Sequence, residues 1–279
     1  MTVLVFTMAM GIGALAAGLV GALTGLGGGV IIVPLLVLAF HVDMRYAIGA
    51  SLVSVIATSS GAASAYVREG FTNIRLGMFL EIATTCGALS GALLAPHVPT
   101  RALAIIFGLV LLYSAYLSHH HVVPHGYLGP ERRLARVFQL DSSLPSPEGP
   151  IPYHVQNVGG GFSLMYVAGI LSGLLGIGSG AVKVLAMDRA MKLPFKVSTT
   201  TSNFMIGVTA AASAGIYLRR GYIDPGVAMP VVIGVLIGSL TGARILTGAR
   251  VDRLRMIFTW VIVGLAVEML YSGMTGRMQ

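Results

Sequence analysis

Residues 17–29, AGLVGALTGLGGG, return 151 residues further along the chain as residues 168–180, AGILSGLLGIGSG. The register holds beyond this stretch, because residues 87–92, GALSGA, match residues 238–243, GSLTGA, at the same spacing. In both copies the best-kept feature is a cluster of glycines that interrupts an apolar run. A duplicated apolar unit with a broken helix in each copy is typical of secondary transporters.

Composition places the chain in a lipid bilayer. It is 55% hydrophobic and only 10% charged, whereas a soluble domain has about 25% charged residues. No charged residue occurs in residues 2–40, 46–67, 102–118, 197–218 and 225–243. Runs of about 20 such residues match the thickness of the hydrocarbon core. The sequence therefore predicts an all-α integral membrane protein.

Charge and cysteine content exclude two further classes of protein. The net charge of +8 comes from residues in short loops between apolar runs, where they act as headgroup contacts and topology signals. Without a basic patch interleaved with aromatic residues, we expect no nucleic-acid partner. A single cysteine, Cys86, excludes an internal disulfide framework.

Each copy is predicted to hold three ordinary membrane spans behind its glycine element. The spans cover residues 45–67, 75–96 and 101–118, then 196–218, 224–244 and 254–273. Between the glycine triplet at 159–161 and Asp188, residues 162–187 leave about 39 Å of helix,. This is too short for two crossings of about 30 Å each. The element is thus either one broken span or a re-entrant hairpin.

Basic residues favour the hairpin. If the element crosses once, the two sides of the membrane carry eight and nine Arg or Lys residues. If it re-enters, they carry twelve and five, with Lys183 embedded, which is the asymmetry of a positive-inside topology. An odd number of crossings per copy also inverts the second copy relative to the first. We therefore predict two tandem repeats of inverted topology, residues 1–118 and 161–279, with both termini outside and the linker, residues 119–160, in the cytoplasm.

The linker differs in composition, with six prolines and five histidines. Adjacent histidines do not converge on one ion unless the fold arranges them, so His119, His120, His121 and His125 are predicted to be a solvated or interfacial tract and not a metal site. We expect no cofactor and no metal.

The glycine clusters are the first candidate binding site. A break in a helix exposes backbone N–H groups and a positive helix end, which suits an anion, and missing side chains allow close approach. The candidate residues are Gly27, Gly28, Gly29, Gly178, Ser179 and Gly180. Packing of small residues is the alternative, which we prefer for Gly87, Gly91, Gly238 and Gly242.

Hydroxyl and amide side chains form a second candidate group. Ser51 aligns with Ser202, and the polar run 198–203 lies near the start of a span. Neutral donors of this kind could complete the hydrogen bonds to an oxyanion, and the candidates are Ser51, Thr201, Ser202 and Asn203. Alternatively these side chains bond to their own helix or to a neighbouring one. The aligned pair Thr58 and Thr209 is a weaker candidate.

Two ionisable residues lie inside apolar runs, which makes them functional candidates by default. Lys183, four residues after Ser179, either pairs with an anionic substrate or extends to the interface. Glu81 either takes part in proton coupling or pairs with Arg75, six residues earlier.

Residues 25–36, GLGGGVIIVPLL, and residues 47–52, AIGASL, resemble the sulfite exporter TauE/SafE family. The similarity extends over nearly the whole chain except the linker. It implies a multi-pass transporter of small sulfur-containing anions, such as sulfite, sulfoacetate or other organosulfonates, in a prokaryotic inner membrane. The expected function is thus a permease that works by alternating access, with a proton or a sodium ion as candidate coupling ion. An anion channel with the same glycine site is the alternative, and an enzyme is not expected.

Overall fold

The computed structural model describes residues 3–24, 28–68, 70–119, 133–145, 149–246 and 251–276. The first half contains α1 (Val3–Thr24), α2 (Gly29–Pro34), the π-helical segment η1 (Leu35–Ala39), α3 (Met44–Arg68), α4 (Ile74–Leu94), the short 3-10 segment η2 (Ala95–His97) and α5 (Thr100–His119). The linker contains α6 (Arg133–Val137), β1 (Ser142–Leu144) and β2 (Ile151–Tyr153). The second half contains α7 (Val158–Leu175), α8 (Gly180–Leu185), the π-helical segment η3 (Ala186–Ala190), α9 (Phe195–Arg219), α10 (Pro225–Leu246) and α11 (Val251–Thr275). The prediction of an all-α chain is confirmed, apart from the small β1–β2 pair.

The helices of the two halves begin at the spacing of the sequence repeat. α2, η1 and α3 each start 151 residues before α8, η3 and α9. Several helices start at residues whose side chain accepts a hydrogen bond from the first turn. These residues are Asn73 before α4, Asn157 before α7 and Asp224 before α10. Such caps stabilise a helix by about 1 kcal/mol each. Because Asn157 caps α7, the triplet at 159–161 lies inside the helix and not before it.

Each glycine element folds back on itself. In the first half, the ring of Phe6 near the start of α1 lies 5.5 Å from that of Phe40, just after η1. In the second half, the backbone N–H of Gln156, before α7, donates to the carbonyl oxygen of Met191, just after η3, at 3.1 Å. Both elements therefore return to the end of the bundle at which they began, as a hairpin does.

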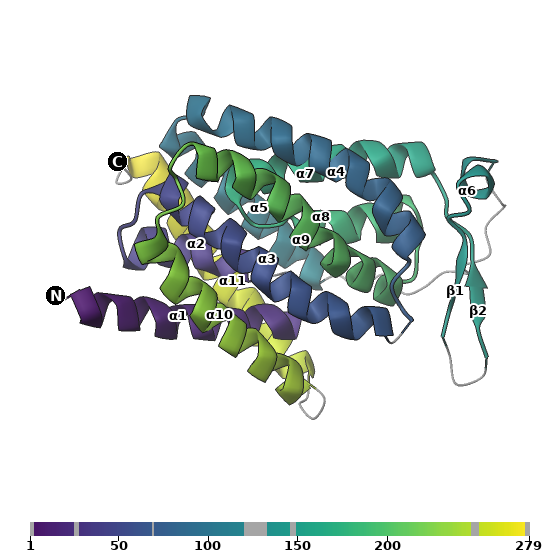
Figure 1. Cartoon of the computed structure of the whole chain (residues 1–279), viewed down its shortest axis with the longest axis horizontal. Coiled ribbons are helices and arrows are strands. Elements are labelled where there is room, and N and C mark those ends of the chain that lie inside the picture. The colour runs from purple at the N-terminus through teal and green to yellow at the C-terminus, as the bar shows by residue number, and fades with distance from the viewer. Residues whose placement is uncertain are drawn as a thin grey trace.

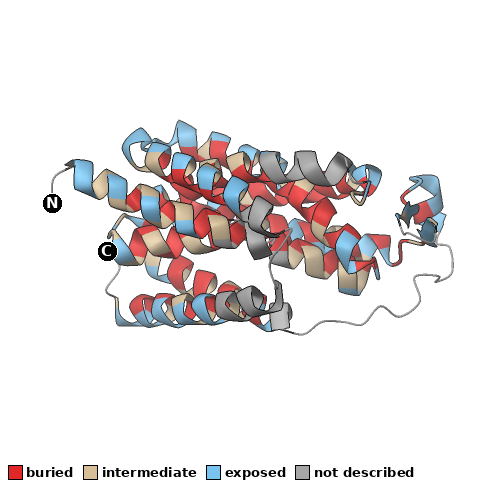
Figure 2. Cartoon of the chain, turned by 90° about the horizontal axis from the view of Figure 1, so that it is seen from below, coloured by how far each residue is buried: buried red, intermediate tan, exposed pale blue. Residues whose placement is uncertain are grey.

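The two hairpins start at opposite ends of the bundle. Figure 1 shows both chain termini at one end and the β1–β2 pair at the other, and Figure 2 shows the same arrangement from a second direction. Arg45 donates to the carbonyl oxygen of Pro96 at the end with the termini. At the linker end, the ammonium of Lys196 lies 3.4 Å from the centre of the Phe71 ring. α3, at 25 residues, extends about 37 Å between these ends,.

Glycines bring helices of the two halves into close contact. α4 packs on α7, and α1 packs on α10. A Cβ atom at Gly87 or Gly91 of α4 would overlap the backbone carbonyl oxygen of Tyr166 or Ile170 in α7. A Cβ at Gly238 of α10 would overlap the backbone of α1 in the same way. These glycines are thus required for helix packing, as small residues are in membrane proteins.

Apolar side chains cover both the inside and the outside of the bundle. Figure 2 shows buried residues along the inner faces of the helices and exposed residues along their outer faces. The exposed residues include large apolar side chains such as Trp260, Met274 and Leu218. Among the described residues, two helical segments are long and apolar enough to cross a membrane, Ile74–His97 and Val158–Leu175, and five shorter helices are apolar. A large exposed apolar surface suits a lipid environment.

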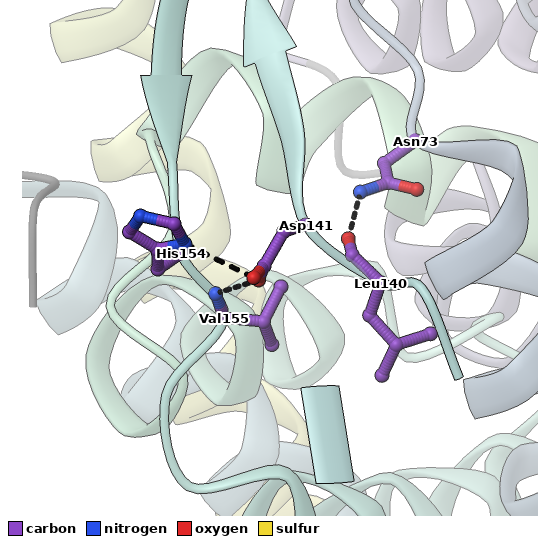
Figure 3. Close-up of polar contacts among 5 residues, drawn as sticks. All are labelled: Asn73, Leu140, Asp141, His154 and Val155. Carbon is purple, nitrogen blue, oxygen red and sulfur yellow. Dashed lines mark hydrogen bonds and ion pairs between the residues drawn. The ribbon is translucent and has the colours of Figure 1, made fainter. Parts of the chain in front are cut away.

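The linker packs onto one end of the bundle through polar contacts (Figure 3). The side-chain nitrogen of Asn73 donates to the carbonyl oxygen of Leu140 at 2.8 Å and to the hydroxyl of Tyr153 at 3.0 Å. Asp141 accepts from the backbone N–H of Val155 at 2.7 Å and contacts the ring of His154 at 3.0 Å. Burial raises the pKa of Tyr153 above its ordinary value. Part of the linker is therefore folded onto the bundle, although the tract from His120 to His125 lies outside the described residues.

Candidate functional site

The two glycine breaks meet inside the bundle. A Cβ atom at Gly29, the first residue of α2, would lie 3.0 Å from the carbonyl oxygen of Gly176, just after α7, and 2.8 Å from the hydroxyl of Ser51. The hydroxyl of Ser51 donates to that same carbonyl oxygen at 2.8 Å. Of the candidate residues, Gly27 lies outside the described residues. Gly28 has an ordinary helical φ of −63°, so its backbone does not require glycine.

The second break has an unusual backbone. Gly176, Gly178 and Ser179 have φ values of 68°, 67° and 46°. For a residue with a side chain, adopting this left-handed conformation costs about 1–2 kcal/mol. The Ser179 hydroxyl is also buried, and it has no hydrogen-bond partner among the described residues. Backbone strain together with an unpartnered buried polar group is more typical of a functional site than of simple packing.

Lys183 lies one helical turn beyond Ser179 on α8, and its side chain has no exposed area. It therefore does not extend to the interface. Its ammonium donates a 2.5 Å hydrogen bond to the hydroxyl of Thr209 in α9. Among the described residues, this is the one hydrogen bond found for the Lys183 ammonium. An ammonium has three protons to donate, so two remain for a ligand. A fully buried ammonium with spare donors can bind an anion.

Glu81 completes a buried polar network. Its Oε1 atom accepts from the hydroxyl of Thr209 at 2.7 Å and from that of Thr85 at 3.1 Å. Its Oε2 atom is buried without a partner in the described part of the structure. The predicted alternative, a pair with Arg75, is not what the structure shows, because the Arg75 guanidinium donates to Gln139 at 3.0 Å. Thr209 instead connects the carboxyl group of Glu81 to the ammonium of Lys183.

The predicted hydroxyl and amide candidates do not form one cluster. Ser202 donates to the carbonyl oxygen of Gly180 at 3.3 Å and so lies against the second break. Thr201 accepts from the backbone N–H of Asn73 at 3.1 Å, which directs its hydroxyl to the start of α4. Asn203 is buried, with 6% of its surface exposed, and no hydrogen bond of its side chain is found among the described residues. Ser51 and Ser202 thus both donate to backbone carbonyl oxygens of the second break.

One polar group of this region is only a weak candidate by sequence, and another is not a candidate at all. Thr209 was treated as weak, yet it is the bridge of the network. Its alignment with Thr58 is the sequence signal that pointed to Thr209, and that alignment does not predict the hydrogen bond to Glu81 on α4. The hydroxyl of Ser172 in α7 is also fully buried without a partner in the described chain. Among the described residues, no group of three or more His, Cys, Asp or Glu side chains could hold a metal ion.

Comparison with known proteins agrees with a membrane transporter. The family model described as "Sulfite exporter TauE/SafE" matches residues 10–269. "Probable membrane transporter protein YunE" of Bacillus subtilis (strain 168) is 27% identical over 266 residues, which cover 93% of this chain and 95% of that protein. "Probable membrane transporter protein MJ0441" of Methanocaldococcus jannaschii is 23% identical over 267 residues, 91% of each chain. No solved structure matches the chain. Since the family model spans nearly the whole sequence, the chain belongs to the sulfite exporter TauE/SafE family.

Proposed function

We propose that the protein is a secondary active permease for small sulfur-containing anions such as sulfite, sulfoacetate or other organosulfonates. The observation that carries this proposal is the fully buried ammonium of Lys183, four residues after Ser179 at the second glycine break, whose buried hydroxyl has no hydrogen-bond partner among the described residues. A buried ammonium is costly in a membrane, and an anionic substrate that accepts its remaining hydrogen bonds would offset part of this cost in the loaded state.

The proposed site combines one charge with neutral donors. The ammonium of Lys183 and the hydroxyl of Ser179 supply hydrogen bonds to a sulfonate or sulfite oxygen. Glycines at the breaks, among them Gly28, Gly178 and Gly180, let the anion approach the main chain, since no Cβ shields it. The buried amide of Asn203 is a further donor, while the hydroxyls of Ser51, Thr201 and Ser202 keep the surrounding backbone in place.

The hairpins provide the elements for alternating access. They enter the bundle from opposite ends and meet at Gly29 and Gly176, so access from either side ends at the same place. In transporters built from inverted repeats, one repeat rocks against the other around such a fixed site. We propose that the two halves are inverted repeats in a prokaryotic inner membrane, with the linker in the cytoplasm.

Counter-transport tests the permease. Purified protein in liposomes preloaded with unlabelled sulfite should take up labelled sulfite faster than empty proteoliposomes, because a carrier exchanges one anion for another. Voltage-driven flux without acceleration by preloaded anion would identify a channel instead. Uptake equal to that of protein-free liposomes, for sulfite and for organosulfonates alike, would exclude the proposed function.

Thermal-shift screening tests the substrate class. Anions that bind only the folded protein raise its apparent stability by mass action. Sulfite, thiosulfate, sulfoacetate and methanesulfonate should raise the melting temperature more than acetate at equal concentration. An equal response to acetate would remove the preference for sulfur oxyanions while leaving an anion permease.

Cysteine labelling tests the membrane topology. In a Cys86→Ala background, Ser143→Cys in β1 and Thr275→Cys at the end of α11 lie at opposite ends of the bundle. An impermeant maleimide added to intact cells should label the Thr275→Cys protein and not the Ser143→Cys protein. Equal labelling of the two positions would contradict the proposed orientation.

A further inference from the structure

The buried network contains one cation and one acid. Lys183 of α8 and Glu81 of α4 do not touch directly but share the hydroxyl of Thr209. With 9% of Glu81 and none of Lys183 exposed, both groups lie away from water. The ionised pair is neutral as a whole, so in the empty state Glu81 balances the charge of Lys183.

Thr209 can serve Glu81 in either protonation state. Its hydroxyl has two acceptors within hydrogen-bond distance, Glu81 Oε1 at 2.7 Å and the carbonyl oxygen of Met205 at 3.0 Å. When Glu81 is ionised, the Thr209 proton is directed to the carboxylate. When Glu81 is protonated, it can donate to Thr209, whose own proton then turns to Met205. The hydroxyl remains bonded in both states, because it has one proton to give and two lone pairs to accept with.

An incoming anion would be a second negative charge for the same ammonium. Ser179 immediately precedes α8 and Lys183 lies four residues later, within that helix, so an oxyanion held by the Ser179 hydroxyl would come close to the Lys183 ammonium. Two negative charges against one positive charge are unfavourable in a low-dielectric interior. Protonation of Glu81 removes the excess charge.

We propose that anion binding at Lys183 and protonation of Glu81 are coupled, so that one proton from the solvent adds to the Glu81 carboxylate for each anion bound and leaves with it. This inference rests on the proposed function. It assigns the proton as the coupling ion and places the exchange at a single carboxyl group. Thr209 acts as a positioning residue that holds the acid next to the ammonium.

Among the described residues, Lys183 is the charged group that hydrogen bonds connect to Glu81, through Thr209. Other titratable or charged side chains on α4, or on elements near it, are exposed, lie toward helix ends or are bonded to other groups. They are Arg75 and Cys86 on α4, His97 on η2, Tyr166 on α7, Asp188 and Arg189 on η3, and Lys196, Tyr217, Arg219 and Arg220 on α9. For example, the hydroxyl of Tyr217 donates to the carbonyl oxygen of Gly173 at 3.1 Å.

The network spans both halves of the chain and has no counterpart at the positions related to it by the sequence repeat. At the spacing of 151 residues, the positions of Lys183, Thr209 and Glu81 correspond to Ile32, Thr58 and Val232. The second set contains neither a cation nor an acid. The expected stoichiometry is therefore one proton per anion and not two.

Calorimetric titration of the purified protein tests the coupling. The probe is methanesulfonate, which stays ionised across the working pH range, so the protein is the source of any pH dependence. Titrations in two buffers with different ionisation enthalpies give the number of protons bound per anion. We expect a value near one where Glu81 is ionised in the empty protein, and an affinity that falls about tenfold per unit of rising pH there.

Variants separate coupling from binding. Glu81→Gln should bind methanesulfonate with no proton uptake and with an affinity independent of pH. Glu268→Gln, which removes an exposed carboxylate on α11, should retain one proton per anion. Thr209→Ser should retain the wild-type pH profile, whereas Thr209→Val should shift it; a merely structural Thr209 would change the melting temperature and leave the pH profile in place.

The outcomes distinguish the two proposals. Anion binding without proton uptake in the wild-type protein, or with unchanged uptake in Glu81→Gln, overturns the coupling and leaves the permease intact. Failure of methanesulfonate, sulfite and sulfoacetate to bind the folded wild-type protein overturns both.

Discussion

Lys183→Met removes the buried charge while keeping an unbranched side chain of similar length. If the ammonium binds the substrate, the variant loses a charge-assisted hydrogen bond worth about 1.5–3 kcal/mol. The expected loss of affinity is about 10- to 150-fold, since each 1.4 kcal/mol is about a factor of ten. The assay is the dissociation constant for sulfoacetate, measured by calorimetry on protein that elutes as a single species.

Stability gives a second, independent readout of the same substitution. Lys183→Met leaves Glu81 without its cation, and breaking a buried charge pair costs about 3–5 kcal/mol when the remaining group stays charged. We therefore expect a lower melting temperature, most of it restored in the double variant Lys183→Met, Glu81→Gln. Restored stability with the affinity still lost would separate substrate binding from folding. Normal affinity in a well-folded Lys183→Met protein would refute the assignment of Lys183 to the site.

Ser179→Gly should leave the free energy of unfolding unchanged within about 1 kcal/mol, because relief of the strained left-handed backbone offsets the greater entropy of the unfolded chain. The same substitution should weaken anion binding about 10-fold or more, because it removes a hydrogen-bond donor to a charged group. Unaltered affinity would exclude the Ser179 hydroxyl from the site. Gly91→Val should lower the free energy of unfolding by more than about 1 kcal/mol, because the new Cβ would overlap the carbonyl oxygen of Ile170. The control Gly264→Ala, at a position with open space around it, should not lower stability in this way. Asn73→Ala loses a helix cap and two donated hydrogen bonds and should destabilise the α4 end by about 1–2 kcal/mol, seen as faster protease cleavage in the linker. Unchanged cleavage would mean that other contacts hold the linker.

Helix positions were predicted well because apolar runs and their charged ends define them. The predicted spans 45–67 and 196–218 correspond to α3, Met44–Arg68, and α9, Phe195–Arg219. The breaks also lie where the glycines indicated, since α1 ends at Thr24 and α2 begins at Gly29. These features depend on residues close together in the chain, so sequence reasoning reaches them.

Partners of polar side chains were predicted poorly. Arg75 and Glu81 lie six residues apart, yet Arg75 turns to the linker and Glu81 turns to α9. The Thr201 hydroxyl, for which the sequence leaves both a substrate contact and a bond to a helix open, accepts from the backbone N–H of Asn73. In each case the partner lies on a helix that is remote in sequence, and helical periodicity does not specify which faces of two such helices meet.

The sequence alone determined that this chain enters a membrane, that it carries one unit twice and that each unit breaks at its glycines, because composition and spacing are local properties. The tertiary structure decided that the breaks fold back as hairpins from opposite ends, which brings Gly29 against Gly176. It also decided that Lys183 and Glu81 share Thr209, although 128 residues separate Glu81 from Thr209. The physical reason is packing: glycines on α4 and α7 let the backbones of these two helices touch. α4 also packs against α9, and these contacts fix which side chains meet in the interior.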